Sequence, residues 1–120
     1  MKDIVEKIKE KFSDKILNFE EKSIRRIYID FKPEDIPAAV KFVFKDLGCR
    51  FSTATGIDTP QGIEILYHFS EDATGKIITL STVIADKKNP QIQSITPIIT
   101  GAEWIEREIW ELLGVNFIGH

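Results

Sequence analysis

The side chains with the greatest capacity for acid–base chemistry lie in one stretch near the C-terminus. Glu106 and Glu108 stand two positions apart there, and a pair of carboxylates is what a hydrolase uses to donate and to accept a proton. On a helix, however, positions i and i+2 point about 200° apart, so these two carboxylates cannot share one substrate. A hydrolase that uses Glu106 or Glu108 is therefore the function that we rank last.

The other reactive side chains do not form a recognisable site either. An iron–sulfur cluster needs about four thiolates, and Cys49 is the single cysteine of the sequence. His68 and His120 lack the spacing of zinc ligands, and we expect His68 to be a partly exposed histidine of a sheet. No serine or cysteine lies in a nucleophile motif, and no glycine-rich loop matches a phosphate site. We expect this chain to have no catalytic residue, metal or cofactor of its own.

Size and composition favour a single domain over residues 1–120. The sequence is 42% hydrophobic and 29% charged, which is ordinary for a globular protein. A net charge of −3 disfavours nucleic acid as a partner. One cysteine cannot form an internal disulfide, and the charged start does not resemble a signal peptide, so we expect an intracellular protein. Lys41 and Lys45 interrupt the most apolar helix, so any membrane association should pass through another protein.

Hydrophobic periodicity predicts the order of the structural elements. Helical periods cover residues 3–12, 33–48 and 101–113. Alternating patterns predict strands over residues 15–21, 24–31, 50–58, 62–69 and 76–85, and a short segment, 91–99, precedes the last helix. Asp35 is the expected N-cap of the second helix. The order α-β-β-α-β-β-β-α predicts an α+β fold, with an antiparallel or mixed β-sheet and helices packed on one face.

The last helix carries more large side chains than its core contact requires. At about 100° per residue, its apolar stripe consists of Ala102, Ile105, Ile109, Leu112 and Leu113. Trp104 and Trp110 lie outside that stripe among charges, and the carboxylates are expected to be solvated or interfacial. Arg107 can pair with Glu103 or Glu111, four positions away on either side. A tryptophan ringed by charges is typical of a protein–protein hot spot, although the first helix or the C-terminal tail could cover Trp110.

The C-terminal stretch also carries a resemblance to a known family. The 30 kDa subunit family of respiratory complex I has the pattern Glu-Arg-Glu, two residues, an acid, two apolar residues, six residues and a histidine. The matching positions in this sequence are Glu106, Arg107, Glu108, Glu111, Leu112, Leu113 and His120. The segments Ser94-Ile95-Thr96 and Tyr67-His68-Phe69 are similar to two further family segments. Glu111 departs from the aspartate that is usual in the family, and the family pattern continues beyond its histidine.

The resemblance implies a peripheral-arm subunit on the cytoplasmic side of a membrane-bound complex. Such a subunit holds no metal and packs against a large subunit, which carries a quinone site or a [NiFe] centre, and against a small iron–sulfur subunit. A compact member also resembles the equivalent subunit of energy-converting [NiFe] hydrogenases. The interface candidates that follow are Trp104, Glu106, Arg107, Glu108, Glu111 and His120. The alternative is a small-molecule-binding regulatory module, which needs a pocket of convergent polar groups.

Overall fold

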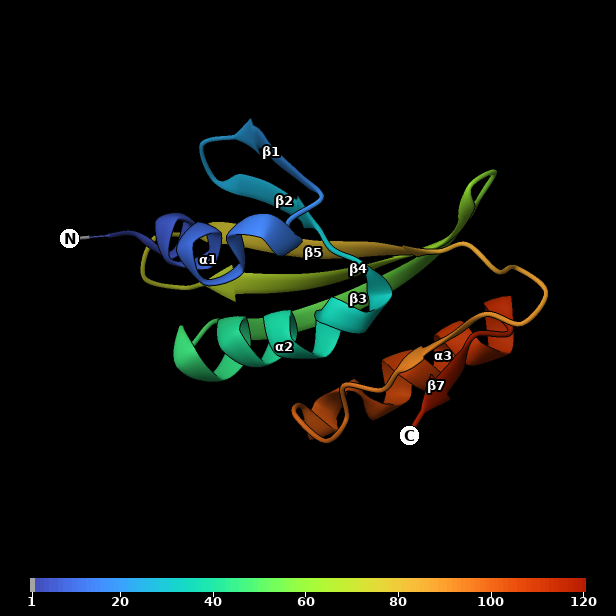
Figure 1. The fold of residues 1–120 in the computed structure, drawn as a ribbon. Coiled ribbons are helices and arrows are strands. Elements are labelled where there is room, and N and C mark those ends of the chain that lie inside the picture. Colours follow the sequence, from blue (N-terminus) through green and yellow to red (C-terminus); the bar gives the residue numbers. More distant parts are fainter. Residues whose placement is uncertain (1) are drawn as a thin grey trace.

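Five strands form one mixed sheet in the order β1-β2-β5-β4-β3 (Figure 1). The computed structural model describes residues 2–120. The strands are β1 (Asn18–Ser23), β2 (Arg26–Asp30), β3 (Arg50–Thr59), β4 (Gly62–Glu71) and β5 (Lys76–Ile84). β2 pairs with β5 in parallel, whereas the other neighbours are antiparallel. The mixed α+β sheet predicted from the sequence is confirmed.

The described residues form three α-helices, of which only the first begins with a side-chain cap. They are α1 (Ile4–Phe12), α2 (Ile36–Lys41) and α3 (Glu103–Leu113). Asp3 caps α1, because its Oδ1 accepts the backbone N–H of Glu6 at 2.9 Å. The expected helix over residues 33–48 is a 3-10 turn, then α2, then a π turn over Phe42–Asp46. None of the helices in residues 2–120 is long and apolar enough to cross a membrane.

Asp35 stands at the N-cap position of α2, as predicted, but it lacks the capping contact expected of that position. Asp35 ends the 3-10 turn Pro33–Asp35 with helical backbone angles, and its side chain makes no capping hydrogen bond. Pro33 at the first position of that turn has no N–H to be satisfied, so less capping is needed there.

All three helices contact the same face of the sheet. Ile63, Ile65, Tyr67 and Phe69 are buried on that face of β4, as their alternation predicted. Phe12 of α1 meets Phe31, the residue after β2, edge to face with ring centroids 5.4 Å apart, and α2 contacts β5. α3 approaches β3 at Gly56, where a Cβ would lie 2.8 Å from Leu113 Cδ1. No helix in residues 2–120 covers the opposite face, which we call the open face.

A second, smaller sheet flanks α3. It consists of β6 (Gln91–Gln93) and β7 (Asn116–Ile118), which pair in parallel. The sequence indicated only an untyped segment at residues 91–99, and it did not predict β7. Gly114 ends α3 as expected, with φ of 72° and its N–H bonded to Trp110 O at 2.8 Å. The chain then turns back along α3, so that β7 lies beside this helix (Figure 1).

The turn between β3 and β4 should be intolerant of any side chain at Gly62. Its φ is +150°, and a Cβ there would lie 2.3 Å from the carbonyl oxygen of Ile84. We expect Gly62→Ala to lower the free energy of unfolding in urea by about 2 kcal/mol or more. Gly101→Ala is the matched control, because its Cβ would meet nothing within 4 Å, and it should change stability by less than about 0.5 kcal/mol. Equal effects of the two substitutions would contradict this account.

Candidate functional site

The inner side of α3 holds the helix against the sheet. Ala102 and Ile109 are buried, and Ile105 and Leu113 are half-buried. Leu112 was expected in this stripe, but it is 79% exposed. The true core side of the helix is therefore rotated away from Leu112 and towards Glu106.

The carboxylates of α3 were expected to be solvated or interfacial, and Glu106 is not solvated in this chain. Its side chain is only 1% exposed, and each carboxylate oxygen accepts a hydrogen bond. The Ser94 hydroxyl donates to Oε1 at 2.7 Å, and the Ile95 backbone N–H donates to Oε2 at 2.8 Å. Glu106 therefore ties the segment after β6 to α3. Both oxygens of Glu106 are thereby engaged, whereas Glu108 is exposed on another side of the helix, so the two carboxylates do not act together.

Two opposing influences act on the Glu106 carboxyl. Burial raises its pKa above the ordinary value, while the hydrogen bonds from Ser94 and Ile95 and the charge of His120 oppose that rise. Tyr67 lies on the face of β4 that the helices contact. Its pKa is raised, first by burial of the side chain and then by the charge of Glu106. Its hydroxyl has no hydrogen-bond partner among residues 2–120. A polar cluster thus lies beneath α3, inside an otherwise apolar core.

The outer side of α3 exposes two tryptophans around a fixed arginine. Trp104 is 74% exposed and Trp110 is 55% exposed. The Arg107 guanidinium lies 5.6 Å from the centre of the Trp104 ring, and its Nε is 3.5 Å from Glu111 Oε1. The predicted pairing of Arg107 with Glu111 is confirmed. We call Trp104, Arg107, Trp110 and Glu111 the tryptophan face.

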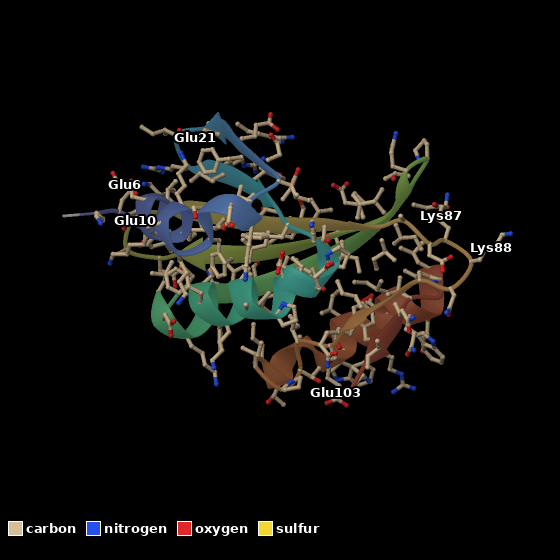
Figure 2. All side chains as sticks on the ribbon, in the orientation of Figure 1. Glu6, Glu10, Glu21, Lys87, Lys88 and Glu103 are labelled. Carbon is tan, nitrogen blue, oxygen red and sulfur yellow. The ribbon has the colours of Figure 1, made fainter. Side chains whose placement is uncertain are left out.

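The helix directs this face away from the rest of the chain. At about 100° per residue, Arg107 and Glu111 lie between the two indoles on the side opposite Ile109. Glu103 marks the same outer side, and its side chain projects away from the sheet (Figure 2). The sequence left open that α1 or the C-terminal tail covers Trp110. Neither buries it, since Trp110 is exposed.

Hollows border the tryptophan face on both sides. One, of about 380 Å³, lies between α3 and β7 and is lined by Arg107, Trp110 and His120 among others. His120 is held there by a 3.1 Å contact between its Nε2 and the carbonyl oxygen of Glu103. The other, of about 390 Å³, is lined by Trp104 and Glu108 and reaches the edge of β3. Five of the six interface candidates therefore surround one outer surface, and Glu106 lies beneath it.

The remaining reactive side chains are placed elsewhere. His68 is half-buried on the open face, as expected. Cys49 is buried, and burial together with the charges of Glu71 and Asp72 raises the pKa of its thiol to about 11, so it is a poor nucleophile. Within residues 2–120, no three His, Cys, Asp or Glu side chains gather as a metal site would require.

The sequence pattern missed Glu106 because helical periodicity counts every carboxylate as polar surface. Its donors come from residues 94 and 95, which are distant in sequence. One signal could have found the contact, since Ser94-Ile95-Thr96 and Glu106 both belong to the segments that carry the family resemblance.

Removing the Glu106 carboxylate should loosen the segment after β6. Glu106→Ala leaves the Ile95 N–H and the Ser94 hydroxyl without their acceptor, and we expect it to lower the free energy of unfolding by about 2–3 kcal/mol. Glu106→Gln keeps the shape and one acceptor, so its loss should be clearly smaller. Glu108→Ala, at an exposed position of the same helix, is the control and should be nearly neutral. Urea denaturation measures all three, and equal losses for positions 106 and 108 would contradict the contact.

The same carboxyl should make stability depend on pH. Because its folded pKa is raised above the ordinary 4.5, the folded chain holds this proton more tightly than the unfolded chain. The resulting stability is fully present below about pH 4.5 and is lost as the pH rises through the raised pKa. Wild type should therefore lose stability relative to Glu106→Gln over that window, measured by urea denaturation from about pH 4 to about pH 8. The raised pKa would be refuted if the free energy of unfolding of wild type, minus that of Glu106→Gln, stayed constant or increased with pH.

Comparison with known sequences identifies relatives over most of the chain. The family described as "Respiratory-chain NADH dehydrogenase, 30 Kd subunit" matches residues 29–120. The C subunit of the NADH-quinone oxidoreductase of Ruegeria sp. (strain TM1040) is 32% identical over 98 residues, which cover 77% of this chain and 48% of that protein. The C/D subunit of the Bacteroides thetaiotaomicron enzyme is 33% identical over 76 residues, which cover 61% of this chain and 14% of that protein. Across the C-type relatives that it matches, the chain spans about half of their length.

Two solved structures share the fold. One is titled "Nqo5 of the trypsin-resistant fragment (1-134)"; it has a TM-score of 0.80 and 19% identity and covers 97% of this chain and 96% of its own. The other belongs to the membrane-bound sulfane sulfur reductase (MBS), an archaeal respiratory membrane complex. Its TM-score is 0.82 with 24% identity, and the match covers 98% of this chain and 69% of that one. The resemblance seen in the sequence is confirmed: the chain belongs to the family of the 30 kDa subunit of respiratory-chain NADH dehydrogenase.

Proposed function

We propose that this chain is a docking subunit of a membrane-associated, ion-translocating oxidoreductase of the complex I or energy-converting hydrogenase type, with no catalytic centre of its own. The observation that carries the proposal is the tryptophan face of α3. Two indoles exposed on one short helix, with an arginine fixed between them, are costly for a surface that only meets water. They are typical of the centre of a protein interface.

The tryptophan face is organised before any partner binds. Arg107 is held from two sides, by the Trp104 ring and by Glu111. Because these two contacts favour one position of the side chain, binding should lose less conformational entropy than it would with an arginine that has no neighbours. When a partner excludes water, the Arg107–Glu111 pair and any new partner of Arg107 become stronger. Trp104 supplies the large buried area, and the hollows on either side can accept protrusions of the partner.

The proposed partners are a large subunit that carries a quinone site or a [NiFe] centre and a small iron–sulfur subunit. The Bacteroides relative supports the first, because its name joins the C and D subunits and this chain matches only a small part of it. The likeness to a chain of an archaeal respiratory membrane complex supports membership of the wider group. The chain would lie on the cytoplasmic side and reach the membrane only through these partners.

Glu106 would contribute to docking as a positioning residue. Its carboxylate holds α3 against the segment after β6 from below, so the outer side chains of the same helix keep a fixed direction. Glu108 and His120 border the two hollows, where they would contact the partner at the rim.

Replacing the centre of the tryptophan face should prevent assembly without unfolding the chain. We expect the double variant Trp104→Ala/Arg107→Ala to recover at least about tenfold less large subunit than wild type, because central aromatic and arginine residues dominate interface energies. Its free energy of unfolding should change by less than about 1 kcal/mol, since both side chains are exposed. The measurement is mass spectrometry of the complex purified through a tag on this chain from membranes of its host.

The matched control exchanges an equally exposed apolar–arginine pair elsewhere. Ile24 is 83% exposed and is followed by the exposed Arg25 in the turn between β1 and β2, so Ile24→Ala/Arg25→Ala should assemble like wild type. Unchanged recovery with Trp104→Ala/Arg107→Ala would remove the docking role of this face.

A further inference from the structure

The open face of the sheet contains a hollow that the docking proposal does not use. Strand register places two rows of side chains side by side across β2, β5, β4 and β3. One row is Arg26, Ile77, Ser70 and Arg50, and the next is Tyr28, Thr79, His68 and Thr53. All eight residues line a hollow of about 320 Å³. It is therefore built from cross-strand neighbours on the rigid part of the fold.

The residues that line this hollow carry positive charge, whereas the whole chain is negatively charged. Its lining contains two arginines, one histidine and several hydroxyl groups, but no carboxylate, although the net charge of the chain is −3. Arg26 makes no ion pair with the residues that the structure describes, whereas Arg50 does. Arg50 binds Asp72 through Nε and a terminal nitrogen, both at 3.2 Å.

Neighbouring side chains hold the polar groups of the hollow in place. Asp72 also accepts the Ser70 hydroxyl at 2.9 Å, so the Arg50 side chain is anchored at the rim. The His68 ring lies between two threonines, with Nδ1 2.9 Å from Thr79 Oγ1 and Nε2 3.4 Å from Thr55 Oγ1. Thr79 is 1% exposed and forms the floor. Arg50 and His68 are therefore already held in place when a ligand enters, which lowers the entropic cost of their part in binding.

We propose that this hollow binds a small-molecule oxyanion, a metabolite that carries phosphate or carboxylate groups. The Arg26 guanidinium would be its main electrostatic contact, because its charge is not neutralised within the described chain, and guanidinium matches the geometry of phosphate and carboxylate. The hydroxyl and imidazole groups between the arginines would supply the hydrogen bonds.

The spacing of the two arginines favours a ligand with two anionic groups. Arg26 and Arg50 start from strands three interstrand steps apart, or roughly 14 Å between backbones at about 4.8 Å per step. Asp72 anchors Arg50 at one end of the row, and Arg26 stands unpaired within the described residues at the other end. A single tetrahedral anion bound at Arg26 is too small to reach Arg50 too. A diphosphate or a tricarboxylate is longer and would approach both arginines. We therefore expect pyrophosphate and citrate to bind more tightly than sulfate.

The test is a titration of the isotopically labelled chain of residues 1–120, followed by NMR at constant ionic strength and near-neutral pH. Pyrophosphate, citrate and sulfate are the probes. The expected result is saturable shifts at Arg26, Ser70 and His68 on the open face. Arg26→Gln should weaken pyrophosphate binding by about tenfold, the value of one charge-assisted contact. Arg25→Gln, which removes the neighbouring arginine outside the hollow, should bind like wild type.

Three outcomes would overturn the proposal. The first is shifts that do not saturate or that spread over the surface lysines, which indicate screening only. The second is equal binding by Arg26→Gln and Arg25→Gln. The third is a glutamate-rich peptide that binds the open face more tightly than pyrophosphate, which indicates a protein ligand. Because the titration uses the chain alone, its result is independent of whether the tryptophan face docks a partner.

Discussion

The buried carboxylate of Glu106 is the contact on which the C-terminal third of the chain depends. It is the one carboxylate of α3 that faces inwards, and it satisfies a hydroxyl and a backbone N–H of the segment that follows β6. A buried carboxylate is tolerated only when hydrogen bonds replace its hydration. The β6–β7 pair is too small to be stable alone, so it relies on its packing against α3 and the 3-10 turn Pro33–Asp35 and on this contact.

The orientation of the tryptophan face follows from the same arrangement. α3 is fixed at two points, by the close approach of Leu113 to Gly56 on β3 and by Glu106 on the side of β6. Because these contacts occupy the inner side of the helix, its opposite side faces outwards. That outer side carries both indoles and Arg107. The shape of the candidate surface is thus set by contacts made beneath it, while its composition is set by residues that the fold itself does not need.

Local patterns were sufficient for much of this architecture. Alternation placed Ile63, Ile65, Tyr67 and Phe69 on one buried face, and helical periodicity located α1 and α3 within a few residues. Features that depend on partners distant in sequence were not predictable in this way. The parallel pairing of β2 with β5, the strand β7 and the inward direction of Glu106 all require knowledge of what lies opposite. Leu112 was placed in the apolar stripe of α3 but is exposed. The pattern of one helix does not show how far the neighbouring elements extend over it.

The order of the main sheet leaves two free edges of unequal character. β1 carries Glu20, Glu21 and Lys22, charges that discourage another strand from adding alongside. β3 has no charged residue from Phe51 to Ile57, and a bulge at Ser52 is its irregularity there. The sheet is therefore protected against the addition of another strand at β1 and less protected at β3. Self-association of the isolated chain should therefore begin along β3.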